Sequence, residues 1–114
     1  MNLWLSKADP IIPSINTRLY YEAVMKGDPY THSYYRHFEA PGVGHCYNGQ
    51  GLYPASIFDS LVRWVERGEV PEQLIVDTSG LTGPKKGRIL CPHPKKSRYR
   101  GTGDAFEVSS YYCA

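Results

Sequence analysis

Two short motifs in this 114-residue chain hold side chains suited to acid–base chemistry. Asp9 opens an Asp-Pro turn after a short apolar run, and His45 ends the loop Pro41-Gly42-Val43-Gly44-His45 after a second run. A carboxylate that fixes the tautomer of an imidazole, which then acts as general base, supplies the acid and base of a Ser-His-Asp triad. We interpret Asp9 and His45 as this pair. Taken alone, each motif has a plainer interpretation as a turn or a shaped loop.

The order of the two motifs predicts where the nucleophile lies. In hydrolases whose parallel sheet is flanked by helices, the serine comes first, the acid second and the histidine last, each on a loop after a strand. Asp9 and His45 keep this order, and no segment with a serine of this kind precedes them. We therefore predict that residues 1–114 form the C-terminal segment of one catalytic domain, whose nucleophile-bearing half lies outside the chain.

Hydrophobic patterns place a strand before each motif. Residues 2–5 are typical of a short buried strand that stops before Asp9, and the aromatic-rich residues 33–39 indicate a second strand that ends at Pro41. Between the strands, Ser14 can cap a helix that ends at Gly27. The apolar positions of this helix repeat at helical spacing: Ile15, Leu19, Tyr20, Ala23 and Val24.

A second amphipathic helix is predicted further along the chain. Ser56 followed by Asp59 has the pattern of a capping box, and Gly68 ends the helix. Its apolar face consists of Ile57, Leu61, Val62 and Val65, widened by Trp64. Residues 73–77 indicate an edge strand or an extended crossing, and residues 78–114 are mostly loop. The succession strand, helix, strand, helix predicts an α/β fold with parallel strands joined by crossover helices, followed by a loop-rich tail.

Charge and hydropathy point to no nucleic-acid or membrane partner. The net charge is +2, but seven of the thirteen basic residues lie between Lys85 and Arg100: Lys85, Lys86, Arg88, Lys95, Lys96, Arg98 and Arg100. Such a run could bind phosphates, with Tyr99 as a stacking partner. Prolines within it, however, prevent one helix from presenting all these charges on a single face. A solvated surface segment is the plainer interpretation. No stretch approaches the roughly 20 apolar residues that span a bilayer.

Five separated blocks of the sequence resemble the tannase and feruloyl esterase family, in the family's order and from about Leu3 to Cys113. They are Ala8-Asp9-Pro10-Ile11-Ile12-Pro13 with Tyr20-Tyr21-Glu22-Ala23-Val24, Pro41-Gly42-Val43-Gly44-His45-Cys46, Trp64-Val65-Glu66-Arg67-Gly68-Glu69-Val70-Pro71, Arg88-Ile89-Leu90-Cys91-Pro92-His93-Pro94, and Tyr99-Arg100-Gly101-Thr102-Gly103-Asp104 with Cys113. The resemblance implies the C-terminal part of an α/β-hydrolase fold. It also implies a serine esterase that cleaves esters of aromatic carboxylic acids.

The resemblance assigns roles to single positions. Asp9 matches the triad acid, and His45 matches the general base that takes the serine proton and later protonates the leaving alcohol. Cys46 matches a cysteine that the family joins by a disulfide to one beside the nucleophilic serine, here in the absent N-terminal part. The substrate-binding lid and its calcium would also lie outside this chain, which is expected to hold no cofactor and no metal.

The remaining cysteines and histidines receive structural interpretations. Cys91 and Cys113 flank the tail, which has too little apolar material to fold alone, so we predict a disulfide between them. Disulfides and an odd Cys46 fit a secreted protein. His32 and His37 are expected at the surface or in strand pairing, and His93 is expected to decorate a loop.

Three functions remain open at this stage. The first is a secreted carboxylic ester hydrolase of which this chain holds only the acid and base, so that it is inactive alone. The second is a small basic module that binds polyanions through residues 85–100. The third is a secreted interaction domain that keeps the fold and the disulfide but uses no triad.

Overall fold

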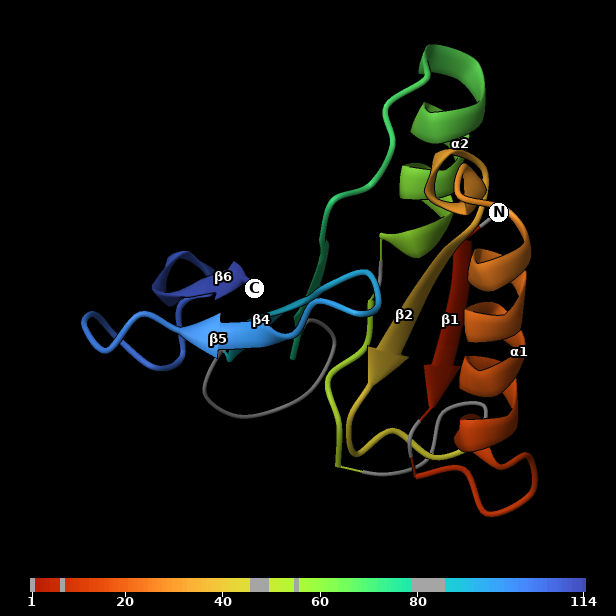
Figure 1. Cartoon of the computed structure of the whole chain (residues 1–114). Helices are drawn as coiled ribbons and strands as arrows, with labels where there is room; N and C mark the ends of the chain where they lie inside the picture. The colour runs from red at the N-terminus through yellow and green to blue at the C-terminus, as the bar shows by residue number, and fades with distance from the viewer. Residues whose placement is uncertain (1, 7, 46–49, 55, 79–85) are drawn as a thin grey trace.

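The computed structural model describes residues 2–6, 8–45, 50–54, 56–78 and 86–114. Figure 1 shows a helix-covered sheet on one side and a smaller tail on the other. The elements, in chain order, are β1 (Asn2–Ser6), α1 (Ser14–Gly27), the 3₁₀ turn η1 (Thr31–Ser33), β2 (Arg36–Ala40), α2 (Ile57–Arg67), β3 (Leu74–Asp77), β4 (Gly87–Leu90), β5 (Ser97–Tyr99), η2 (Val108–Ser110) and β6 (Tyr111–Cys113).

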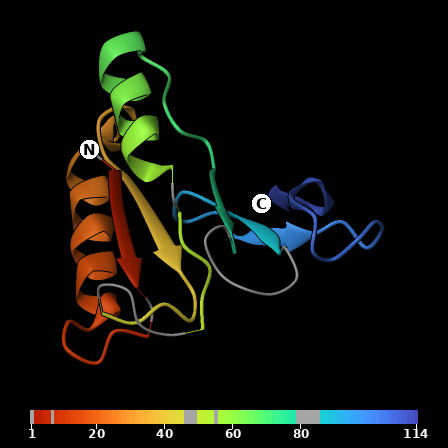
Figure 2. The ribbon, with the colours of Figure 1, turned by 180° about the vertical axis from the view of Figure 1, so that it is seen from behind.

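The strands β1 and β2 run parallel and are joined through α1. Their register pairs Asn2 with Arg36 at one end and Ser6 with Ala40 at the other. Both views of the ribbon place α1 along this strand pair (Figures 1 and 2). Because the strands are parallel, the loops that follow them leave from the same edge of the sheet.

The helix α1 has the predicted length but neither the predicted cap nor the predicted buried face. Ser14 is its first residue rather than its cap, Pro13 precedes it, and no side chain caps the N-terminus. Tyr21 is fully buried, whereas Leu19 is 54% exposed and Tyr20 63% exposed. The helical spacing correctly placed the apolar residues along one face of α1. The described residues of the chain, however, pack against the neighbouring face, which carries Tyr21.

The second strand starts three residues later than predicted. Residues 31–33 form η1, and the Thr31 hydroxyl donates to the Asp28 carbonyl at 2.6 Å, so the chain turns before it extends. Within β2 the consecutive residues His37 and Phe38 are both buried. Both faces of this strand are therefore covered, so its burial does not alternate from residue to residue.

The helix α2 ends at Gly68 as predicted but does not form the predicted capping box. Gly68 adopts a left-handed conformation with φ 69° and donates to the Trp64 carbonyl at 3.0 Å. No side chain caps the N-terminus, so the interpretation of Ser56 with Asp59 is wrong. Trp64 is buried while Val65 is 77% exposed, so the buried face is rotated away from the predicted one.

The tail contains more regular structure than the sequence suggested. The strand β3 pairs antiparallel with β4, and β5 pairs antiparallel with β6. A disulfide joins Cys91 to Cys113, with Cα atoms 5.6 Å apart, which is the predicted pair. The hydrophobic core spans both parts of the molecule and consists of Phe38, Ala40, Val43, Leu74, Val76 and Leu90.

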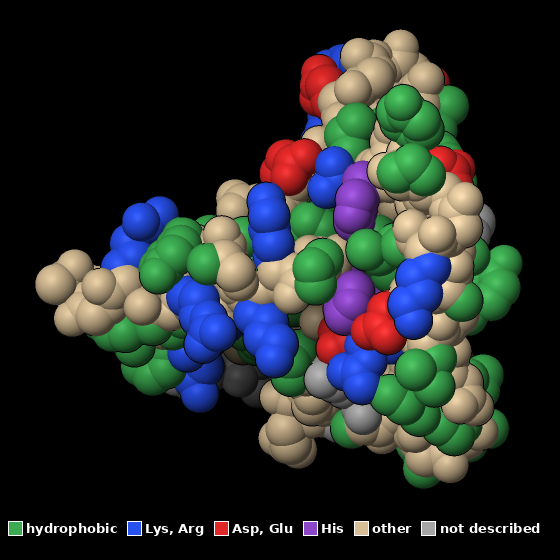
Figure 3. All heavy atoms as spheres, viewed as in Figure 1, with side chains coloured by type: hydrophobic (Ala, Val, Ile, Leu, Met, Phe, Trp, Pro, Cys, Tyr) green, Lys and Arg blue, Asp and Glu red, His purple; other side chains and the backbone are tan. Residues whose placement is uncertain are grey.

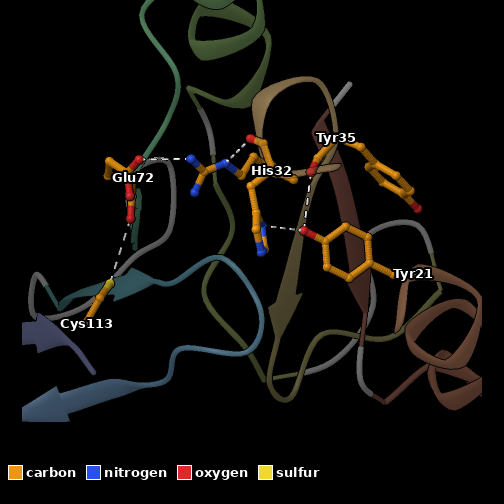
Figure 4. A network of polar contacts seen from close by, with 6 residues as sticks. Tyr21, His32, Tyr35, Glu72 and Cys113 are labelled. Atoms are coloured by element: carbon orange, nitrogen blue, oxygen red, sulfur yellow. Dashed lines mark hydrogen bonds and ion pairs between the residues drawn. The ribbon is translucent and has the colours of Figure 1, made fainter. Parts of the chain in front are cut away.

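Polar contacts also connect the tail to the sheet. Glu72 accepts a hydrogen bond from Arg36 at 2.9 Å, and its carbonyl oxygen lies 3.9 Å from Cys113 Sγ (Figure 4). Because this sulfur is in a disulfide and has no proton, the second approach is a contact rather than a hydrogen bond. The His93 N–H donates to the His37 carbonyl at 2.8 Å. No described helix is long and apolar enough to cross a membrane.

Candidate active site

Asp9 lies in a tight turn that follows β1. Its Oδ1 accepts hydrogen bonds from the backbone N–H groups of Ile11 at 2.8 Å and Ile12 at 2.9 Å. An Asp side chain that binds the backbone two and three residues ahead holds the turn and its own rotamer together. This arrangement leaves Oδ2 available, and the Asp9 side chain is only 7% exposed.

His45 follows β2 at the same edge of the sheet. The strand ends at Ala40, and Gly42 turns the chain with φ 75°, a left-handed conformation that favours glycine. Val43 is fully buried in the core, and its carbonyl accepts a hydrogen bond from Ala8 N–H at 2.9 Å. The backbone of the His45 loop is thereby bound directly to that of the Asp9 loop.

The two predicted side chains meet. His45 Nδ1 lies 2.9 Å from Asp9 Oδ2, and the His45 side chain is 36% exposed. The predicted geometry, a carboxylate and an imidazole in hydrogen-bond contact on loops after neighbouring parallel strands, is confirmed. In open α/β sheets the carboxyl ends of the strands are where active-site loops gather.

The local electrostatics favour an ionised acid. The Ile12 N–H holds the pKa of Asp9 below its usual value, with further lowering by His45 and the Ile11 N–H, while burial opposes the shift. An ionised carboxylate can only accept a hydrogen bond, so the proton between the two groups belongs to His45 Nδ1. The neutral ring then has an unprotonated Nε2, which is the atom that a general base uses.

Two other histidines are more deeply placed than predicted. His37 pairs with Leu3 across the strands but is fully buried, so the surface alternative is wrong. Neither of its ring nitrogens is within hydrogen-bond distance of a partner, although Nε2 lies 3.7 Å from Glu39 Oε1, and burial lowers its pKa. His93 does more than decorate a loop, because its Nε2 lies 3.2 Å from Glu22 Oε1 and its ring meets that of Tyr21 edge-on.

Sequence reasoning missed this cluster around Tyr21. The Tyr21 hydroxyl donates to the Tyr35 carbonyl at 3.2 Å and lies 3.1 Å from His32 Nδ1 (Figure 4). The rings of Tyr21 and His37 are 5.3 Å apart between centroids. The signal in the sequence was weak, because a tyrosine next to the apolar positions of α1 gives no indication of which histidines it will contact.

Some basic residues of the tail contact aromatic rings within the tail itself. The Arg88 guanidinium lies 4.6 Å from the centroid of the Tyr111 ring, and the Arg100 guanidinium lies 5.2 Å from that of Tyr112. Tyr99, the predicted stacking partner, packs against Tyr111 at 5.5 Å. Figure 3 shows Lys and Arg side chains spread along the tail and its junction with the sheet. Lys85 lies outside the described residues.

A groove of about 840 Å³ lies at this junction, and neither Asp9 nor His45 lines it. Its polar lining includes Arg18, Glu22, Glu39, His93, Lys95 and Lys96. Within the described ranges, no group of three or more His, Cys, Asp or Glu residues is placed to hold a metal ion. Cys46, the residue predicted to pair outside the chain, falls outside the described residues.

Comparison with known proteins decides the family. The model of the family described as tannase and feruloyl esterase matches residues 1–114. The chain belongs to this family. It is 35% identical over 117 residues to a mono(2-hydroxyethyl) terephthalate hydrolase of Piscinibacter sakaiensis, covering 100% of this chain and 19% of the relative. It is 40% identical over 119 residues to a probable feruloyl esterase of Arthroderma benhamiae, covering 97% of this chain and 22% of that relative.

The structural comparison agrees with this assignment. A solved esterase of Aspergillus oryzae superposes with a TM-score of 0.85 at 25% identity, over 99% of this chain and 27% of that one. The fold is thus of the α/β-hydrolase type found in these esterases, and the family is one of carboxylic ester hydrolases. The chain spans about a fifth of the length of the curated relatives it matches.

Proposed function

We propose that this chain supplies the acid and the base of a serine carboxylic ester hydrolase that acts on esters of aromatic acids. The observation that carries the proposal is the 2.9 Å contact between His45 Nδ1 and Asp9 Oδ2 at the carboxyl ends of two parallel strands. The substrate class follows from the names of the relatives, which include feruloyl esterases and a terephthalate ester hydrolase.

In the proposed reaction the nucleophile is a serine outside this sequence. His45 Nε2 takes the serine proton while the oxygen attacks the ester carbonyl, and Asp9 stabilises the imidazolium that results. The tetrahedral intermediate collapses to an acyl-serine as His45 gives the proton to the leaving alcohol. A water molecule, deprotonated by His45 in turn, then attacks the acyl-serine and releases the aromatic acid and the free serine.

Further parts of the enzyme are proposed in the portion that this chain does not contain. Cys46 would form a disulfide with a cysteine beside the nucleophilic serine, which would draw the base toward the nucleophile. The lid that selects the substrate, and any calcium held by that lid, would also belong to that portion. We propose that this chain itself holds no cofactor. The disulfide between Cys91 and Cys113 supports a secreted, oxidising location.

An open strand edge and exposed apolar side chains fit a surface that the remainder of the enzyme would cover. In the described structure β1 pairs with β2 alone, so its second edge is open. The predicted apolar stripe of α1 and the turn before it are exposed at Ile11, Ile12, Ile15, Leu19 and Tyr20. Apolar patches and open strand edges of this kind mark interaction surfaces or aggregation-prone ones. We assign them to the nucleophile-bearing portion of the enzyme.

Esterase assays test the proposal directly. The purified chain alone should not hydrolyse methyl ferulate or methyl gallate, because it lacks the activated serine. Joined to the nucleophile-bearing portion, it should regain turnover, and His45→Ala should abolish it. Turnover by the isolated chain that disappears in His45→Ala would mean that one of its own serines is the nucleophile. Full activity of the joined His45→Ala variant would remove His45 from the mechanism.

A further inference from the structure

Gly51 lies where the chain passes against the backbone that leads to His45. Its N–H donates to the Gly42 carbonyl at 2.9 Å. A Cβ atom at residue 51 would lie 2.4 Å from the Pro41 oxygen, 2.5 Å from Val43 Cγ2 and 2.6 Å from the Val43 nitrogen. Real Cβ atoms essentially never come within 3.0 Å of such atoms. Any side chain at this position must therefore separate residue 51 from the segment 41–43.

The contacted segment is bound on another side to the Asp9 loop. Val43 precedes His45 by two residues, is fully buried, and accepts the hydrogen bond from Ala8 N–H at 2.9 Å through its carbonyl oxygen. The nitrogen of Val43 therefore lies close to Gly51, and the carbonyl oxygen of Val43 is bound by Ala8, the residue before Asp9. A shift of this residue moves the His45 loop relative to Asp9.

We propose that Gly51 is a positioning residue for His45: the absence of a side chain lets the backbone close on residues 41–43 and holds Nδ1 in line with Asp9 Oδ2. This inference rests on the role proposed above for His45. Hydrogen bonds weaken steeply as their geometry departs from linear, and working sites are held to within about 0.5 Å. A displacement of the size that a Cβ at residue 51 demands exceeds this tolerance.

The test reads the tautomer of His45 by long-range ¹H–¹⁵N spectra of the chain labelled with ¹⁵N-histidine, at a pH where the ring is neutral. In the unsubstituted chain His45 should carry its proton on Nδ1, since Asp9 accepts it. Gly51→Ala should lose this preference and favour Nε2–H, the tautomer that free histidine prefers. Gly27→Ala is the matched control, because a Cβ at residue 27 meets no atom within 4 Å.

A second variant and an internal signal separate positioning from unfolding. Gly42→Ala would place its Cβ 3.3 Å from Gly51 N and would also strain the backbone at its φ of 75°, so it should shift the same equilibrium in the same direction. The resonances of buried His37 report whether the sheet is intact in each variant. An intact sheet with an unchanged His45 tautomer in Gly51→Ala overturns the proposal. So does unfolding of both variants, because the two glycines would then serve the stability of the fold alone.

The readout does not depend on catalysis. If the tautomer responds as expected but the joined enzyme has no esterase activity, the proposed function is wrong while the positioning role of Gly51 stands. If the enzyme is active and His45→Ala abolishes turnover, yet Gly51→Ala leaves the tautomer unchanged, the proposed function stands and the positioning role is wrong.

Discussion

The Ala8 N–H donates a hydrogen bond to the Val43 carbonyl at 2.9 Å, and this backbone contact joins the two loops that hold Asp9 and His45. Ala8 immediately precedes Asp9, and Val43 lies two residues before His45. A backbone contact so close to both side chains fixes their separation more firmly than the flexible side chains could by themselves. The backbone of this chain therefore organises the Asp9 and His45 pair by itself, which would reduce the reorganisation that the proposed reaction needs.

Asp9→Asn should reduce the dependence of stability on acid pH. The pKa of Asp9 is lowered in the folded chain, chiefly by the Ile12 N–H, from a usual value of 3.8. A lowered carboxyl pKa adds stability that is fully present above the unfolded pKa and is lost as the pH falls below it. Urea unfolding between pH 5 and about pH 2 should show a smaller loss for Asp9→Asn than for the unsubstituted chain. Parallel curves for the two proteins would contradict this.

His37→Phe should stabilise the chain and reduce the dependence of its stability on pH, at a higher pH than Asp9→Asn does. His37 is fully buried, neither ring nitrogen makes a hydrogen bond, and Nε2 approaches Glu39 Oε1 only to 3.7 Å. Leaving such groups unsatisfied costs about 1–3 kcal/mol. Burial lowers its pKa below the usual 6.5, so its contribution is complete above 6.5 and is lost as the pH falls from there.

The measurement for His37 is thermal or urea unfolding from pH 8 down to about pH 5. His37→Phe should lose less stability over this interval than the unsubstituted chain. His32→Phe is a suitable comparison, because His32 Nδ1 has the Tyr21 hydroxyl as a partner at 3.1 Å and its removal breaks a contact. A destabilised His37→Phe would show that the ring has a polar role in the sheet.

Some of this architecture was predictable from the sequence, and the reasons for the rest are physical. Asp9-Pro10 and the glycines before His45 specify local turns, and parallel strands bring such turns to one edge, so the pair could be predicted. Gly68 was predictable because a left-handed residue is a local requirement. The cap at Ser14 was wrong, and Ser56 stands at the cap position of α2 without a cap hydrogen bond, because that bond depends on backbone geometry that the residue type alone does not set.

Longer-range features could not be predicted in the same way. The strands β5 and β6 have three residues each, too few for any periodicity, and their pairing depends on the disulfide and on contacts between basic and aromatic side chains. The burial of Tyr21 rather than Leu19 depends on which face of α1 meets the sheet. An apolar stripe indicates that something covers it but not whether that cover lies within the chain.

Removing the disulfide should unfold the tail before the rest. The bridge between Cys91 and Cys113 closes a loop with a sequence separation of 22, for which constraint of the unfolded chain contributes about 3 kcal/mol. The double variant Cys91→Ala/Cys113→Ala should lower the free energy of unfolding by roughly this amount. Hydrogen exchange should show the largest loss of protection in β5 and β6. Uniform loss across β1 and β2 would instead show that the tail and sheet unfold as one unit.

Leu19→Glu tests whether the exposed stripe of α1 is a surface for the nucleophile-bearing portion. Leu19 is 54% exposed, so the substitution should leave the stability of the isolated chain within about 0.5 kcal/mol. If the stripe is covered in the complete enzyme, a carboxylate there would be buried without a partner, and recovery of esterase activity on joining the two portions should fall sharply. Thr102→Glu, at an exposed polar position in the tail and not on α1, is the matched control and should recover normally. Equal recovery by Leu19→Glu and Thr102→Glu would place the stripe in solvent in the complete enzyme and leave the open edge of β1 as the remaining docking element.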